Sequence, residues 1–142
     1  MKELGRVVSL FISRVDRRER VDRLNLDMGG VVGDKFNGKD LNRSILLTSL
    51  ESYDIARSRD IDIEYGELGE NILVDFNPYS LPLGSKIIIS DAVFKLSQNC
   101  TICKSLSRID VKLPKLLKND RGLFIQVVKP AIISKKDKVY LI

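Results

Sequence analysis

The two cysteines of the chain, Cys100 and Cys103, stand close together in the stretch SQNCTICKS, and the chain contains no histidine. A C-x-x-C pair can form a redox disulfide, supply half of a zinc site, pack as inert core residues, or offer a thiolate to a soft metal or to sulfur. Histidine is the commonest catalytic base and the commonest metal ligand. The site must therefore do its chemistry without imidazole.

The redox and zinc interpretations are both disfavoured. A thioredoxin-type motif needs a helix after the first cysteine, because the helix dipole lowers the pKa of that thiol. The stretch KSLSRIDVKLP is a poor helix former, since it combines serines, β-branched residues and Pro114. A structural zinc ion needs four ligands, and one cysteine pair without histidine supplies two. An inert buried pair stays open.

A thiolate that grips a soft metal or carries a sulfane sulfur is the remaining chemistry. Lys104 adjoins Cys103, and Arg108 follows four residues after Lys104. Cationic neighbours favour the thiolate and can also receive an anionic ligand. The thiol would then be activated electrostatically, in place of a Cys–His pair.

The length and composition predict one ordinary globular domain, residues 1–142, with 44% hydrophobic and 30% charged residues. Apolar runs such as VVSLFI are strand-length, so we expect no membrane span. The N-terminus does not resemble a signal peptide, and two cysteines without an export signal indicate reduced thiols. We therefore expect a cytoplasmic protein.

The formal net charge is +5, and the basic residues gather in SRVDRRERVDR, RIDVKLPKLLKNDR and SKKDK. These stretches fit either a solvated surface or an electropositive rim that attracts a phosphate or a nucleotide-like cofactor. Nucleic acid is not expected as a partner. Aromatic residues are only 6% of the chain, and the basic stretches lack interleaved stacking residues.

Short β-branched runs between turn signals predict a mainly β barrel or sandwich. The expected strands are GRVVSLFIS, RSILLT, ENILVDF, SKIIIS, AVFKLSQ, LFIQVVK, AIIS and KVYLI, with a tight turn at Ser90-Asp91. A capping box of Thr48 and Glu51 predicts one helix in TSLESYDIARSRD. A second short helix is expected in PKLLKNDRG, with Pro114 in its first turn. Residues 14–43 are expected to be mostly loop.

Five stretches occur in a fixed order: GGVVGDKF, LNRSILLTSLES, GELGENILVDF, LPLGSKIIISDAVFKLSQNCTIC and RGLFIQVVKPAIISKKDKVYLI. This succession, from about Val7 to the C-terminus, resembles the MOSC domain. That module is found at the C-terminus of molybdenum cofactor sulfurases and as small stand-alone proteins. The resemblance implies a MOSC-type β-barrel with one or two short helices and a cysteine late in the chain.

The resemblance also implies roles for individual residues. In members with C-x-x-C, such as the amidoxime-reducing branch, the second cysteine is expected to hold molybdenum or sulfur, which is Cys103 here, with Cys100 beside it. Lys104 is added to the expected cofactor contacts as the neighbouring cation. The positions that match the family's cofactor motifs are Gly30, Gly33, Asp34, Arg43, Glu70 and Asn71.

These residue types suit an anionic pterin cofactor, since glycine backbone and arginine bind phosphate oxygens and asparagine pairs with a heterocycle edge. Each also has a plainer interpretation as a turn residue, a cap or a surface charge. The chain departs from the family where many members have histidine after G-D, at Lys35-Phe36, and at Lys136 before Asp137. The first departure puts an acid–base role there in doubt.

The expected function is a molybdenum-cofactor-associated protein that uses Cys103 to carry sulfur as a persulfide or to ligate the molybdenum. Cys100 could resolve the persulfide. The alternatives are a molybdenum-dependent reductase of N-hydroxylated substrates and a non-catalytic cofactor-binding or interaction module, so enzymatic turnover is left open. The expected partners are a molybdoenzyme or sulfur-donor protein and an anionic pterin, namely molybdopterin.

Overall fold

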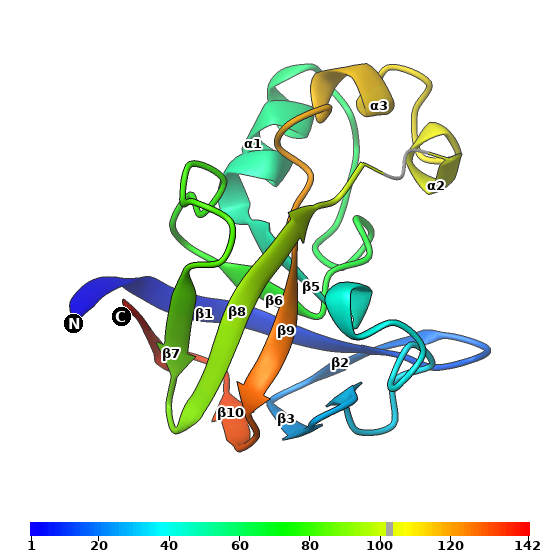
Figure 1. Ribbon diagram of the computed structural model, residues 1–142. Coiled ribbons are helices and arrows are strands. Elements are labelled where there is room, and N and C mark those ends of the chain that lie inside the picture. The colour runs from blue at the N-terminus through cyan, green and yellow to red at the C-terminus, as the bar shows by residue number, and fades with distance from the viewer. Residues whose placement is uncertain (102–103) are drawn as a thin grey trace.

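The computed structural model describes residues 1–101 and 104–142, and it is mainly β, as predicted (Figure 1). Its strands are β1 (Lys2–Ser13), β2 (Arg18–Val21), β3 (Arg23–Asp27), β4 (Gly30–Val31), β5 (Ile45–Ser49), β6 (Ile72–Val74), β7 (Lys86–Ile89), β8 (Ala92–Asn99), β9 (Leu123–Lys129), β10 (Ile132–Ser134) and β11 (Lys138–Leu141). The helices are η1 (Leu41–Arg43), α1 (Leu50–Ser58), α2 (Lys104–Ser107) and α3 (Leu113–Leu116).

The main sheet closes into a barrel. Its strands run in the order β11-β7-β8-β9-β5-β6-β1, and β11 pairs with β1 to complete the ring. Neighbours are antiparallel except β5 and β6, which are parallel. Strand β2 extends the sheet beyond β1, and β10, β3 and β4 form a second, small sheet. The MOSC-type barrel implied by the resemblance is thus confirmed as a closed β-barrel.

Two apolar clusters hold the fold together. The interior of the barrel is filled by inward-facing residues that include Leu10, Ile45, Phe94 and Ile125. The second cluster lies where α1, α2 and α3 gather at one end of the barrel, and Tyr53, Leu68, Leu106 and Leu113 belong to it. A barrel with a helical cap at one end leaves the connecting loops to build a site between them.

The hairpin and helix α1 were predicted, with one error at the start of the helix. Strands β7 and β8 meet at Ser90-Asp91, where Ser90 adopts a positive φ of 54°. Helix α1 lies where expected, but its N-cap is Ser49, whose side chain accepts from the Glu51 amide. The Thr48 hydroxyl instead donates to the Arg121 carbonyl, so the predicted capping box is wrong.

Residues 14–43 were expected to be mostly loop, and the short elements β2, β3, β4 and η1, which were not expected, also lie there. The signal in β3 was short but present, because Leu24 and Leu26 alternate with exposed polar residues. Helix α2 was not expected, and it is a single turn. Helix α3 was expected, with Pro114 in its first turn, and it ends at Leu116, well before Gly122. No helix in the described part of the chain is long and apolar enough to cross a bilayer.

Candidate functional site

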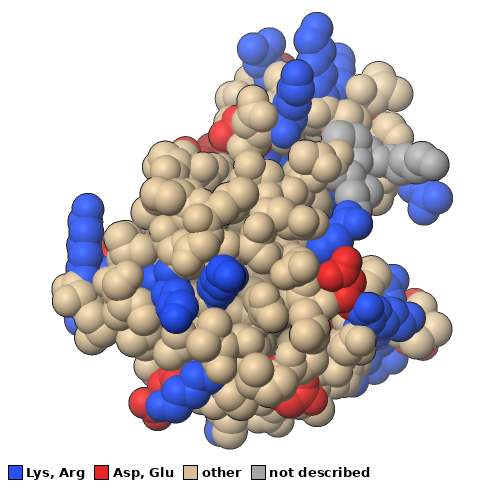
Figure 2. Space-filling model, in the orientation of Figure 1, with Lys and Arg blue, Asp and Glu red and all other residues tan. Residues whose placement is uncertain are grey.

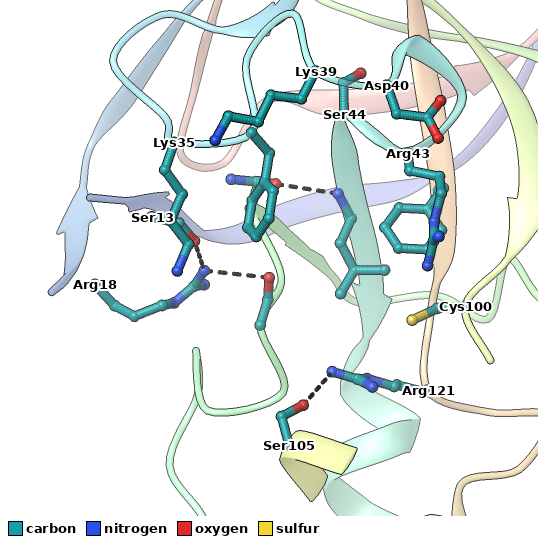
Figure 3. Close-up of a pocket in the computed structure, with 15 residues that line it drawn as sticks. Ser13, Arg18, Lys35, Lys39, Asp40, Arg43, Ser44, Cys100, Ser105 and Arg121 are labelled. Carbon is teal, nitrogen blue, oxygen red and sulfur yellow. Dashed lines mark hydrogen bonds between the residues drawn. The ribbon is translucent and has the colours of Figure 1, made fainter. Parts of the chain in front are cut away.

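A cavity of about 480 Å³ lies between the barrel end, the loop before β5 and the start of α2. Its wall carries five cationic side chains and, among the described residues, one carboxylate: Arg18, Lys35, Lys39, Arg43, Arg121 and Asp40 (Figure 3). Leu46, Phe36 and Phe124 supply apolar wall. A cavity of this size and charge is suited to an anionic small molecule with a flat apolar part.

The space-filling view shows the same region from outside. In Figure 2 the surface is hollowed on the right, between the upper part that carries the helices and the lower part of the barrel. Lys and Arg side chains flank this notch above and below. The positive charge of the chain is therefore partly concentrated around an opening, where it attracts anions more effectively than scattered surface charge does.

Arg43 is held in place by its surroundings. The Asp40 side chain caps η1 through the Asn42 amide, and the Ser97 hydroxyl donates to the Asn42 carbonyl at 2.5 Å. The Arg43 guanidinium lies 5.2 Å from the centre of the Phe124 ring. No hydrogen bond joins its guanidinium to another described residue, so its donors are open to a ligand. The structure thus brings the predicted Arg43 to the cavity.

Arg121, which the sequence analysis did not single out, lies at the inner end of the cavity. Only 7% of the residue is exposed. Its Nη2 donates to the Leu68 carbonyl and to the Ser105 hydroxyl, each at 3.1 Å. Its Nε and Nη1 have no hydrogen-bond partner among the described residues. The only signal in the sequence was an arginine directly before a buried strand, which is too common to be diagnostic.

Arg18 was also missed, and it ties two parts of the site together. Its guanidinium donates to the Ser13 hydroxyl, to the Gly69 carbonyl at 3.2 Å and to the Glu70 carbonyl. Burial lowers the pKa of Arg18, while the nearby carboxylates of Glu70 and Asp34 oppose that shift. Arg18 therefore fixes the loop before β6 against the end of β1.

Cys100 lies at the cavity wall, directly after β8. Its amide donates to the Gly122 carbonyl at 3.0 Å, and 4% of the residue is exposed. Figure 3 shows its sulfur pointing into the cavity, between the side chains of Arg43 and Arg121. The predicted Cys103 lies outside the described residues, and so does the side chain of the predicted Lys104. Their roles stay predictions.

Asp34 and Asn71 are joined to each other beside the cavity. The Asn71 amide donates to Asp34 Oδ1 at 2.9 Å and to the Phe11 carbonyl at 3.1 Å, and its oxygen accepts from the Leu46 amide. Asp34 also accepts from the amides of Ser13 and Phe36. Asn71 lines the cavity, but both ends of its side chain are engaged by the protein. Contact of either residue with a cofactor stays a prediction.

Gly30 and Gly33 shape the loop and do not line the cavity. Their φ angles are 126° and 87°. A Cβ on Gly33 would lie 2.6 Å from Arg14 Nη1, and one on Gly30 would lie 3.1 Å from Ser44 Cβ. Both positions favour glycine for the positive φ, and at Gly30 the nearby Ser44 also leaves little space for a side chain. Their predicted contact with a phosphate stays a prediction.

Glu70 is fully buried behind the cavity and does not line it. The Tyr53 hydroxyl is within hydrogen-bond distance of both carboxylate oxygens, at 2.8 and 2.6 Å, and the Gly66 amide donates to one of them at 3.1 Å. Burial raises the pKa of Glu70, and burial together with the Glu70 charge raises that of Tyr53. These contacts anchor the loop before β6. Direct contact of Glu70 with a ligand also stays a prediction.

Comparisons with solved structures find the same fold in other proteins. YuaD protein from Bacillus subtilis has the same fold, with a TM-score of 0.84 and 20% identity, over 95% of this chain and 93% of that chain. YiiM from Escherichia coli has a TM-score of 0.73 and 20% identity, over 96% of this chain and 69% of that chain. YiiM from Geobacillus stearothermophilus has a TM-score of 0.71 and 17% identity, over 99% of this chain and 74% of that chain.

These identities are low, so the three neighbours show the fold alone. A comparison with curated protein sequences gives no significant match. The family model for the MOSC domain matches residues 27–140, from the end of β3 to within β11. That span includes the segment between β4 and β5 that carries Lys35, Lys39 and Arg43, which we call the cationic loop. It also includes the cysteine pair and the buried Arg121. The chain therefore belongs to the MOSC domain family.

Proposed function

We propose that the cavity binds the molybdenum cofactor and that a cysteine thiolate carries sulfur to the cofactor or ligates its molybdenum. The observation that carries this proposal is the cavity of about 480 Å³, whose wall combines five cationic side chains with the Cys100 thiol. The MOSC family is associated with proteins that handle the molybdenum cofactor, which supports the same direction.

The residues present fit such a group. The cavity lies within the range of roughly 300–1,000 Å³ of small-molecule sites. The open donors of Arg43 and of the buried Arg121 match the acceptor oxygens of a phosphate. The described residues contain no cluster of three or more metal-ligating side chains, so most sulfur or oxygen ligands of a metal would come with the cofactor. When bound, the cofactor would supply a molybdenum centre for oxygen or sulfur transfer.

Each group of the chain has a definite task in this proposal. Lys35 and Lys39 draw the anion into the cavity, because charge that surrounds an opening steers ligands of opposite sign. Arg43 binds phosphate or pterin oxygens through its planar fork, which Phe124 orients. Cys103 is the proposed metal or sulfur ligand, and Cys100 supplies a second thiol at the wall.

Sulfur carriage requires no external oxidant. A cysteine thiolate attacks the terminal sulfur of a donor persulfide, and the bond between the two donor sulfurs breaks. The donor leaves as a thiolate with the electron pair of that bond, and the attacking cysteine becomes the persulfide. A second attack on the terminal sulfur, by the acceptor, regenerates the cysteine thiolate.

The test is the molybdenum and pterin content of protein purified from a host that makes the cofactor. We expect near-stoichiometric molybdenum and pterin in the wild type and loss of molybdenum in Cys103→Ser. Arg43→Ala should lose both, whereas Lys95→Ala, which removes the same charge from the exposed face of β8, should retain both. Absence of molybdenum and pterin from the wild type would contradict cofactor binding.

The outcomes also separate the two roles of the thiol. Molybdenum that disappears in Cys103→Ser while pterin remains supports metal ligation. A persulfide found by intact mass supports sulfur carriage. Reduction of an N-hydroxylated substrate by the loaded protein with an artificial electron donor would support the reductase alternative. Bound cofactor without persulfide or turnover would support a non-catalytic binding module.

A further inference from the structure

The first feature is the pair of Arg121 donors that have no partner among the described residues. A buried guanidinium without partners costs free energy, because the charge has lost water and gained no acceptor. Two hydrogen bonds from Nη2, one to the Leu68 carbonyl and one to the Ser105 hydroxyl, hold the guanidinium in one orientation. Its Nε and Nη1, on different edges of the guanidinium plane, then remain as fixed donors without a partner among the described residues. The oxygens of an oxyanion are suitable acceptors for such charged donors.

The second feature is the position of the Cys100 sulfur. Figure 3 shows it between Arg43 and Arg121, so the sulfur and two guanidinium groups face the same space. Guanidinium donors without partners favour an oxyanion, and a thiolate attacks a sulfur atom that has a good leaving group. A molecule that satisfies both carries a transferable sulfur bonded to a sulfonate group.

Access limits the size of that molecule. Cys100 is 4% exposed and faces the cavity, not the outer surface of the protein. A persulfide presented on the surface of a large donor protein reaches such a sulfur only with a long projecting arm. A small dianion enters the cavity directly and is drawn in by Lys35 and Lys39.

We propose that Cys100 and Arg121 form a donor subsite for small anions of the thiosulfate class. The inference rests on the sulfur-carrier role in the proposed function and names its donor. The Cys100 thiolate attacks the outer sulfur of thiosulfate, and the bond from that sulfur to the sulfonate sulfur breaks. The products are the Cys100 persulfide and sulfite, which leaves with the electron pair of the broken bond. Arg121 and Arg43 bind the sulfonate oxygens, where the negative charge of the leaving sulfite is held.

The experiment incubates the reduced full-length protein with thiosulfate and measures sulfite release and intact mass. We expect the mass of one sulfur atom to be added to the wild type, located on Cys100 by fragmentation, and no added sulfur in Cys100→Ser. Arg121→Lys should lower the rate at limiting thiosulfate about tenfold or more, because the ammonium group of lysine does not reproduce the fixed N–H donors of the guanidinium. Arg23→Lys, the same substitution at an exposed position of β3, is the matched control, and thermal unfolding shows that the variants are folded.

A second donor separates this inference from the proposed function. A small cysteine persulfide carries a transferable sulfur without a sulfonate, so Arg121→Lys should leave its rate within about twofold of wild type. Sulfur transfer from the persulfide but not from thiosulfate would overturn the thiosulfate subsite and leave sulfur carriage standing. Transfer from neither donor would overturn both. Sulfur from thiosulfate found on Cys103 alone, or equal loss with both donors in Arg121→Lys, would also overturn the inference.

Discussion

Asn71 shows how a single side chain can join three segments beside the cavity. Its amide contacts the Phe11 carbonyl on β1, the Asp34 carboxylate in the cationic loop and the Leu46 amide on β5. All three bonds are buried. The residue therefore sets the distance between the loop that carries the cations and the barrel that carries the cysteine.

We expect Asn71→Ala to lower the free energy of unfolding by about 2–3 kcal/mol, because it leaves buried partners without hydrogen bonds. Asn25→Ala is the matched control, since Asn25 is exposed on β3. Urea denaturation of the two variants and the wild type measures the difference. Equal effects at the two positions would show that the buried network contributes nothing specific.

Glu70 predicts a pH dependence of stability. Burial raises the pKa of its carboxyl above the ordinary value of 4.5, against the opposing effects of Tyr53 and Arg18. As pH rises above 4.5, the unfolded chain loses this proton first while the folded protein still binds it. The folded state then binds more protons than the unfolded state, so the contribution of Glu70 to stability falls as pH rises.

The variant that tests this is Glu70→Gln, which cannot titrate. The free energy of unfolding of the wild type should fall relative to that of Glu70→Gln as the pH rises above 4.5. Urea denaturation at matched pH values measures the change. Glu64→Gln, the same substitution at an exposed position, is the matched control. A rising or flat difference for Glu70→Gln would contradict the raised pKa.

At the scale of elements, the junction of β5 and α1 illustrates how tertiary contacts select a helix cap. Thr48 and Ser49 are both buried and both chemically able to cap. The Thr48 hydroxyl donates to the Arg121 carbonyl, and the Ser49 hydroxyl accepts from the Glu51 amide. The start of α1 is thus linked, through Thr48, to the segment before β9 that carries Arg121.

Ser49→Ala should lower the free energy of unfolding by about 1 kcal/mol, the usual cost of removing a helix N-cap. The exposed Ser80→Ala should change it by less than about 0.5 kcal/mol. Thermal or urea unfolding followed by circular dichroism measures both. If Ser49→Ala were neutral while Thr48→Ala disrupted the helix, the capping box predicted from the sequence would be restored.

At the scale of the whole molecule, the barrel and the helices at its end each supply part of the cavity wall. Strands β8 and β9 run side by side to the end where α2 and α3 lie, and there the chain turns through Cys100 and Arg121 (Figure 1). The cationic loop reaches the same end, where η1 packs against β8 and β9, and the bond between Asp34 and Asn71 ties it to the start of β6. The cavity therefore depends on the closed barrel for its dimensions.

Phe94 tests the core of the barrel on which the cavity depends, because it is fully buried in the barrel interior. Phe94→Ala should lower the free energy of unfolding by about 3–5 kcal/mol, since it removes buried area and leaves a void. Phe36→Ala, which truncates the same type of side chain where it is about half exposed, should cost less than about 1 kcal/mol. Urea denaturation compares the two, and similar costs would contradict the assigned core.

Much of the architecture follows from the sequence alone, because strand and helix signals are local. Period-two alternation and β-branched runs predicted β1 and β5 to β11, and capping residues and Pro114 predicted α1 and α3. The short strands in residues 14–43 escaped notice because charged residues and glycines interrupt their two- to five-residue patterns. The order of five motifs indicated the family, which the match over residues 27–140 shows.

The composition of the site was decided only by the tertiary structure. Arg43 and Cys100 were predicted and do lie at one cavity, but nothing local distinguished Arg121 or Arg18 from the other basic residues of the chain. Nor could the sequence show that Glu70 turns inward to Tyr53 while Arg121 keeps two donors open. Residue type limits which chemistry a side chain can perform. Barrel closure brings distant positions together, and it determines which charges meet a partner and which face an open cavity.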